Sequence, residues 1–129
     1  VNDPPSYEVE IDLEKEDVTR IIKAKSALSE SPNMLITTRL DDGNPICEFV
    51  FGDEHGHNNK ITYQISGDIT EESMKIPYNS DTFKTVIHAN KDMEEGTMKI
   101  SSMGLIEFKF KTDEVSSEYY MVRKAETDF

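Results

Sequence analysis

The sequence is poor in the residues that build disulfides and metal centres. Its 129 residues include one cysteine, Cys47, three histidines, His55, His57 and His88, and no tryptophan. One cysteine cannot form an internal disulfide, and this set is too small for a zinc framework of Cys and His ligands. We therefore expect a protein of a reducing compartment that carries no metal or other cofactor.

Long apolar runs are also missing. No stretch approaches the ~20 residues that a membrane-spanning helix needs, and no charged and then apolar leader opens the chain. We expect a soluble protein without a signal peptide and without a membrane partner. The first residue is Val1 instead of Met, which suggests a processed chain or a piece of a longer one.

Basic residues are scarce. Lys and Arg number 14 against 26 Asp and Glu, so the formal net charge is -12. This balance excludes a surface that is basic throughout, and nucleic acid could be bound only by a local patch. Leu, Ile, Val and Phe account for 30 of the 129 residues, which is more than a disordered acidic chain carries. The length suits one globular domain with its own core.

The first half of the chain has the pattern of a strand, a helix and three strands. Apolar and acidic residues alternate from Tyr7 to Leu13, which is typical of a half-buried strand. The apolar spacing then becomes helical, and Asp-Asp-Gly-Asn at 41–44 predicts a hairpin turn. The elements expected here are a strand at 7–13, a helix at 14–29 and strands at 34–39, 46–51 and 60–66.

The second half repeats this order. Asn79, Ser80 or Asp81 can cap a helix that ends near Asn90. The strands expected here are at 74–77, 97–101, 105–111 and 119–124. Two units, about 7–66 and 73–124, thus form an internal duplication. We predict an α+β fold in which the two helices lie side by side on one face of a continuous antiparallel sheet.

Both helices are predicted to carry basic residues away from their apolar side. These residues are Arg20 and Lys23 in the first helix, and Lys84, His88 and Lys91, at i, i+4 and i+7, in the second. Lys25 lies closer to the apolar side of its helix. Phosphate binding needs only positive charge at loose spacing, so such a surface would bind nucleic acid without reading its sequence. A solvated helix face is the alternative, because every amphipathic helix has a polar side.

Candidate catalytic or metal-binding groups are few. Asp53, Glu54, His55 and His57 could ligate a metal, but two histidines at i and i+2 in a glycine-containing loop do not make a ligand shell, and a polar loop is the preferred interpretation. Cys47 lies in an apolar strand, where a buried structural thiol is commoner than a nucleophile. The sequence has no Ser/His/Asp triad, phosphate-binding glycine loop or nucleotide fingerprint, so it indicates no enzyme.

The repeated order of strand, helix and three strands resembles the DNA polymerase sliding clamps. The ending Glu118-Tyr-Tyr-Met-Val-Arg-Lys-Ala-Glu126 is similar to the closing strand and tail of proliferating cell nuclear antigen, although Arg123 replaces the proline expected there. The stretches Glu16-Asp-Val-Thr-Arg-Ile-Ile-Lys23 and Lys124-Ala-Glu-Thr-Asp-Phe129 are more similar still to the C-terminal domain of T-even-like bacteriophage clamps. The resemblance runs from about Ser6 to Phe129.

The resemblance implies a DNA-clamp fold and a role as a processivity factor in DNA replication, in the cytoplasm of an infected bacterial host. Residues 1–6 would be the end of an interdomain connector, and residues 7–129 a single clamp domain of a two-domain subunit. The implied partners are duplex DNA, a DNA polymerase, a clamp loader and further copies of the subunit in a trimeric ring. The resemblance implies no enzymatic activity.

Three groups of residues take roles from this resemblance. Those expected to face DNA are Arg20, Lys23, Lys84, His88 and Lys91. The strand expected to pair with the next subunit is Lys60, Ile61, Thr62, Tyr63, Gln64, Ile65 and Ser66. The expected partner-peptide pocket comprises Met103, Gly104, Leu105, Tyr120, Met121, Val122 and Phe129. In it, Met103 and Met121 would offer adaptable apolar surface, and Gly104 would let a peptide approach the backbone.

Two rival functions stay open at this point. One is a non-enzymatic phage protein-interaction module that does not encircle DNA. The other is a small enzyme that uses the loop of His55 and His57. Retention on circular but not on linear DNA would separate the clamp from both, and metal-dependent turnover would favour the enzyme.

Overall fold

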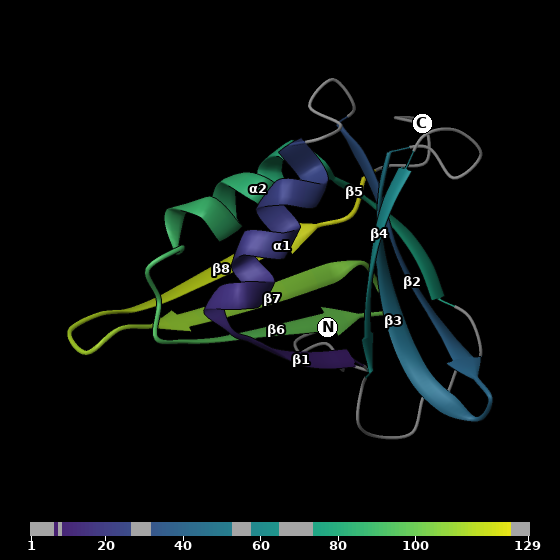
Figure 1. Cartoon of the computed structure of the whole chain (residues 1–129), viewed down its shortest axis with the longest axis horizontal. Helices are drawn as coiled ribbons and strands as arrows, with labels where there is room; N and C mark the ends of the chain where they lie inside the picture. Colours follow the sequence, from purple (N-terminus) through teal and green to yellow (C-terminus); the bar gives the residue numbers. More distant parts are fainter. Residues whose placement is uncertain (1–6, 8, 27–31, 53–57, 65–73, 125–129) are drawn as a thin grey trace, which may run out of the picture.

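The computed structural model describes residues 7, 9–26, 32–52, 58–64 and 74–124, and Figure 1 shows the elements along the chain. The elements are β1 (Val9–Leu13), α1 (Lys15–Ser26), β2 (Asn33–Asp41), β3 (Asn44–Gly52), β4 (Asn58–Gln64), β5 (Met74–Asn79), α2 (Ser80–Ala89), β6 (Glu95–Ser101), β7 (Leu105–Lys111) and β8 (Ser116–Val122). A strand, a helix and three strands therefore follow one another twice, in the order expected from the sequence.

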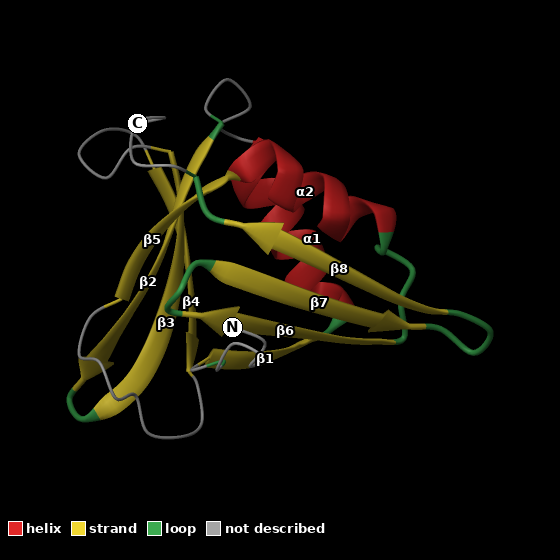
Figure 2. Ribbon diagram, turned by 180° about the vertical axis from the view of Figure 1, so that it is seen from behind, coloured by secondary structure: helices red, strands yellow, loops and turns green. Residues whose placement is uncertain are grey.

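The strands of the described residues form two antiparallel sheets of four strands each (Figure 2). One sheet has the order β1-β6-β7-β8, and the other has the order β4-β3-β2-β5. The first strand of each repeat pairs outside its own repeat, because β1 pairs with β6 and β5 pairs with β2. Each sheet is thus completed by a strand from the other half of the chain.

The two helices lie side by side and pack against both sheets (Figures 1 and 2). This arrangement confirms the α+β class and the single layer of helices. The expected continuous sheet is wrong, because the exchange of β1 and β5 divides the strands between two sheets. Twist accumulates across a sheet, so two short sheets can each turn an apolar face towards the helices. The sheets meet where the Lys124 N–H donates to the Pro77 carbonyl oxygen over 3.0 Å.

Phe83 of α2 joins the two sheets in the core. Its ring centroid lies 5.7 Å from that of Phe49 and 6.2 Å from that of Phe51, both on β3. On the other side it lies 5.7 Å from the ring centroid of Phe108 on β7. All four side chains are fully buried. The core is therefore one continuous cluster centred on α2.

The helix cap and the hairpin turn that the sequence predicted are both present in the structure. Asn79 caps α2, where its side-chain oxygen accepts the Thr82 N–H over 2.9 Å. The β2–β3 turn places Asp42 at φ 50° and Gly43 at φ 82°, the left-handed region that Asp, Asn and Gly tolerate best. The structure thus confirms both predictions.

Most strand boundaries differ from the sequence-based expectation by one to three residues, and two of the differences concern strands at the sheet edges. β4 runs from Asn58 to Gln64 instead of 60–66, and the expected Ile65 and Ser66 lie outside the described residues. β8 begins at Ser116 instead of 119, because its antiparallel pairing with β7 continues to the Lys111–Ser116 pair. Backbone pairing with β7 therefore sets the start of β8, although its first residues are polar.

Lys25 is almost completely buried, with 2% of its surface exposed. It lies on the side of α1 that also buries Val18 and Ile21, and its Nζ is 3.0 Å from Oδ1 of Asp81, in the first turn of α2. A buried ammonium is costly unless a partner compensates its charge. The ion pair therefore connects the end of α1 to the start of α2.

Replacing Asp81 by asparagine should destabilise the domain by about 1–2 kcal/mol, because it weakens the compensation of a buried ammonium. Urea unfolding of Asp81→Asn, Lys25→Met and the double variant would isolate the interaction between the two side chains. Asp92→Asn, an exposed position just after α2, is the matched control. The prediction would be contradicted if Asp81→Asn lowered the unfolding free energy by the same amount in the original protein and in the Lys25→Met background.

Candidate functional site

The exposed side of α1 carries Arg20 and Lys23, as the sequence indicated. Both lie away from Val18 and Ile21, which enter the core. The Arg20 guanidinium is 3.9 Å from the Asp17 carboxylate, one turn earlier, whereas Lys23 makes no ion pair within the described residues. This side of α1 therefore presents two cations, one of them partly neutralised.

On α2 the expected basic stripe is only partly exposed. His88 is exposed, but Lys84 is half-buried, so the expectation that Lys84 is exposed is wrong. Lys91 is exposed but lies in the turn after α2, because the helix ends at Ala89, so its expected place on the helix is also wrong. The buried side of α2 consists of Ser80, Phe83 and Ile87. Lys84 follows Ser80 by four residues and precedes Ile87 by three, which places it at the margin of the buried side. Its aliphatic stem thus packs on the protein while its charge can reach solvent.

Strand β4 is an edge of its sheet. It pairs with β3, and within the described residues no strand pairs with its other side. Ile61 is buried and Tyr63 half-buried, whereas Lys60, Thr62 and Gln64 alternate with them and are exposed. A strand edge of this kind presents unpaired N–H and C=O groups to another strand.

Glu48 is a buried carboxylate on β3 next to this edge. Its Oε1 accepts a hydrogen bond from Arg39 Nε over 2.8 Å, and its Oε2 lies 3.5 Å from Lys60 Nζ and 3.4 Å from the Thr62 hydroxyl. Burial alone would raise the pKa of Glu48, but the Arg39 hydrogen bond and the nearby charges lower it below its ordinary value. The cluster fastens β4 to the sheet. The sequence analysis missed it, although Glu48 is the one charged residue among the apolar residues 46–51.

Replacing Glu48 by glutamine should destabilise the domain by about 1–2 kcal/mol at pH 7. Because the pKa of Glu48 is lower in the folded state, its stabilisation is present above the unfolded pKa, near 4.5, and is lost as the pH falls through the folded pKa. Urea unfolding between pH 3 and 7 should show that the unfolding free energies of the original protein and of Glu48→Gln become equal as the pH falls. Glu10→Gln, on an exposed position of β1, is the control, and a pH-independent gap for Glu48→Gln would refute this account.

Three predicted pocket residues, Leu105, Tyr120 and Val122, lie on the outer surface of the β1-β6-β7-β8 sheet, away from the helices, and a fourth, Met103, lies in the turn that leads into β7. Met103 and Val122 are 79% and 72% exposed, Tyr120 is also exposed, and Leu105 is half-buried. Leu105 on β7 pairs directly with Val122 on β8. We call these four residues the apolar corner. Large apolar side chains that cluster at the surface are typical of a binding site.

Two other predicted pocket residues do not join this surface. Met121 points to the opposite face of β8 and is buried in the core, so its expected role as exposed surface is wrong. Gly104 adopts φ 94° in the β6–β7 turn, and the side chain of Arg123 occupies the space beside it. A peptide could not reach the Gly104 backbone unless Arg123 moved. Phe129 lies outside the described residues.

Tyr7 borders the apolar corner, which the sequence did not indicate. Burial and a hydrogen bond to the Glu107 carboxylate raise the pKa of the Tyr7 hydroxyl. Glu107 in turn lies 3.3 Å from Lys109 Nζ and pairs across the sheet with Tyr120. The start of the domain is therefore fixed beside the exposed apolar residues.

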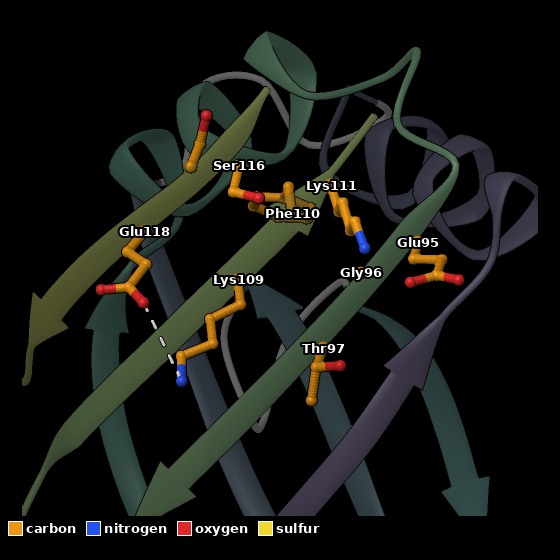
Figure 3. Close-up of a pocket in the computed structure, with 9 residues that line it drawn as sticks. Glu95, Gly96, Thr97, Lys109, Phe110, Lys111, Ser116 and Glu118 are labelled. Carbon is orange, nitrogen blue, oxygen red and sulfur yellow. Dashed lines mark ion pairs between the residues drawn. The ribbon is translucent and has the colours of Figure 1, made fainter. Parts of the chain in front are cut away.

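A shallow cavity of about 270 Å³ lies at the other end of the same outer surface (Figure 3). Its lining consists of Glu95, Gly96, Thr97, Lys109, Phe110, Lys111, Ser116, Ser117 and Glu118. Lys109 Nζ lies 3.9 Å from Glu118 Oε1 across it. Charges of both signs surround the cavity, so its lining does not select an ion of one sign.

The described residues offer no arrangement for metal binding. Within them no three His, Cys, Asp or Glu side chains come together as ligands, and the loop with His55 and His57 lies outside them. Cys47 is buried, and this burial raises the pKa of its thiol to about 12. The thiol is therefore protonated at neutral pH and a poor nucleophile. No helix within the described part of the chain is long and apolar enough to cross a bilayer.

Solved structures with a similar fold are bacterial clamps. The beta clamp of Helicobacter pylori, in complex with diflunisal, matches 95% of this chain at 20% identity and a TM-score of 0.60. The DNA polymerase III subunit beta of Pseudomonas aeruginosa matches 94% at 10% identity and a TM-score of 0.64. This chain spans 32% of the length of each. No protein-family model and no curated protein sequence matches it. The likeness establishes a clamp-domain fold.

Proposed function

We propose that this chain is a domain of a DNA sliding clamp, a processivity factor that encircles duplex DNA and tethers its partners. The observation that supports this most directly is the clamp fold with two adjacent helices that expose Arg20, Lys23 and His88, with Lys91 exposed in the turn after α2. The chain has a formal charge of -12. An acidic protein with a local basic surface attracts phosphates there and repels them elsewhere. Lys84 adds its charge at the margin of this surface.

The proposed mechanism requires only weak contacts with DNA. A closed ring cannot dissociate sideways from a long duplex, so topology supplies the retention and the cations need only screen the phosphates. Strong contacts would slow sliding. Because phosphate contacts do not read the base sequence, the clamp would move over any duplex.

The proposed ring closes through strand edges. A head-to-tail ring needs two different complementary surfaces on each subunit. The segment from Lys60 to Gln64 on β4, continued by Ile65 and Ser66, would pair with an edge of the next subunit. In a two-domain subunit, that edge would belong to the N-terminal domain of the next subunit. We propose three two-domain subunits per ring, with residues 1–6 as the end of the connector between the domains.

The proposed partner site is the apolar corner beside Tyr7. A DNA polymerase or a clamp loader would place apolar side chains of a short segment against Met103, Leu105, Tyr120 and Val122. Burial of one such side chain contributes about 1.5–3 kcal/mol, so an isolated peptide should bind weakly. We expect the C-terminal peptide of the cognate polymerase to perturb the NMR signals of these residues. Perturbations confined to the helices would refute this site.

The test of the proposed function is retention on DNA. The protein, loaded by its clamp loader onto nicked circular DNA, should stay bound during gel filtration at high salt and should be released when the circle is cut once. A Gln64→Pro variant, which places a proline at an exposed position of β4 outside the Glu48 cluster and hinders pairing at this edge, should lose this retention. Equal release from circular and linear DNA would refute encirclement. It would favour the alternative, a non-enzymatic phage protein-interaction module, for which the exposed apolar corner is the supporting observation.

The finer points of the proposal rest on the sequence resemblance to T-even-like bacteriophage clamps. They are the phage origin, the action in the cytoplasm of an infected bacterial host, and the absence of enzymatic activity. Identification of the polymerase that binds the apolar corner would test the first two. Hydrolysis assays with metal ions would test the last.

A further inference from the structure

Arg20 on α1 rests on the side chain of Tyr63 from β4. The guanidinium carbon of Arg20 lies 6.0 Å from the centroid of the Tyr63 ring, within the range of a cation–π contact. Arg20 is also 3.9 Å from the carboxylate of Asp17, which is itself close enough to Tyr63 to raise the pKa of the Tyr63 hydroxyl. Two contacts therefore restrict Arg20, although 57% of its side chain is exposed.

The Tyr63 ring is a fixed support. Its centroid lies 5.3 Å from that of Phe49, which is fully buried in the core, and Tyr63 packs against the core cluster. Because β4 is the edge of the sheet, Tyr63 also belongs to the strand that would pair with the next subunit. Tyr63 thus belongs to the edge strand and its side chain contacts Arg20 on the exposed side of α1.

The two contacts of Arg20 differ in their effect on its charge. The Asp17 carboxylate partly neutralises the guanidinium, but at 3.9 Å it is too far away to accept a hydrogen bond from it. The aromatic face restricts the side chain and also consumes no donor, so the N–H groups of Arg20 stay available to a phosphate. A cation ordered in this way loses less conformational entropy on binding than a freely rotating one.

We propose that Tyr63 is a positioning residue for Arg20, so that the edge strand that closes the ring also holds one of the cations directed at DNA. The inference rests on the proposed function. In this proposal, Arg20 binds a phosphodiester group of the DNA backbone, and the base sequence plays no part. Pairing of β4 with the next subunit would reduce the motion of Tyr63 and with it that of Arg20.

The first test is NMR on the full chain without DNA. The Nε–Hε signal of Arg20 should shift when Tyr63→Leu removes the ring, and should stay near its original position in Tyr63→Phe, which keeps the ring. Tyr119→Leu, another half-buried tyrosine, is the control because it contacts Phe110 on the other sheet. Thermal melting identifies any variant that does not fold, and if Tyr63→Leu is one of them, Tyr63→Met, which also removes the ring, takes its place in the comparison with Tyr63→Phe. An Arg20 signal that does not respond to loss of the ring would overturn the proposal.

The second test is binding of a duplex DNA oligonucleotide at low salt. Tyr63→Leu should weaken binding about two- to fivefold when Arg20 is present and should have no effect in an Arg20→Gln background. Equal losses in both backgrounds would overturn the proposal, since Tyr63 would then act on the fold alone. Arg20→Gln and Lys23→Gln could leave DNA binding unchanged even though Tyr63→Leu still shifts the NMR signal of Arg20. This result would refute the DNA-facing surface, and with it the role of Tyr63 in positioning Arg20 for DNA.

Discussion

Replacement of Arg20, Lys23, Lys84 and Lys91 together by glutamine is expected to weaken binding to duplex DNA about a hundredfold near 50 mM salt. Each phosphate contact contributes about 0.9 to the slope of log affinity against log salt, so the loss of four contacts should reduce this slope by up to about 3.6. Fluorescence anisotropy with a labelled duplex at several salt concentrations measures both quantities. The stability of the domain should change little, because none of the four side chains is fully buried.

The control for this variant removes charge from the other side of the protein. Lys99, Lys109 and Lys111 lie on adjacent strands, β6 and β7, of the sheet surface that faces away from the helices. Their replacement by glutamine makes the protein more acidic without changing the helices, so it should reduce binding much less. A similar loss in both variants would show that net charge, and not a DNA-facing surface, governs the affinity.

Replacement of Phe83 by alanine is expected to destabilise the domain by about 3–5 kcal/mol. Phe83 contacts Phe49 and Phe51 of one sheet and Phe108 of the other, so its removal leaves a cavity at the junction of the two sheets and α2. Single domains are stable by only about 5–15 kcal/mol, so this variant should be at or near unfolding at physiological temperature.

Urea unfolding followed by circular dichroism measures this loss. Phe83→Leu keeps most of the apolar volume and should cost clearly less than Phe83→Ala. Tyr120→Ala removes an aromatic ring of similar size from an exposed position and should change the stability by less than about 0.5 kcal/mol. A loss of under about 1 kcal/mol for Phe83→Ala would contradict the view that α2 joins the two sheets.

The sequence predicted the order of the elements because that order depends on local patterns. The strand at the start of the chain, the turn at 41–44 and the Asn79 cap each arise from neighbouring residues. The structure confirms all three, the strand over Val9–Leu13. The exposed positions of Arg20 and Lys23 also follow from helical spacing alone. Local pattern also predicted a strand at 60–66, close to the observed β4, whereas its place at a sheet edge was implied only by the resemblance to sliding clamps.

Only the tertiary structure decided how the strands divide between two sheets. The pairings of β1 with β6 and of β5 with β2 join residues far apart in the sequence, and no local spacing encodes them. The same holds for Lys25, which is buried because Asp81 of the other helix lies 3.0 Å away. A distant partner compensates its charge.

Tertiary contacts also decided the composition of the apolar corner. Leu105 and Val122 share the outer surface because their strands pair in register, and the alternation along β8 then turns Met121 into the core. The Arg123 side chain covers Gly104. Local sequence sets which residues are apolar and which are charged, whereas strand register and packing set which of them meet, because those contacts form between segments that only the folded chain brings together.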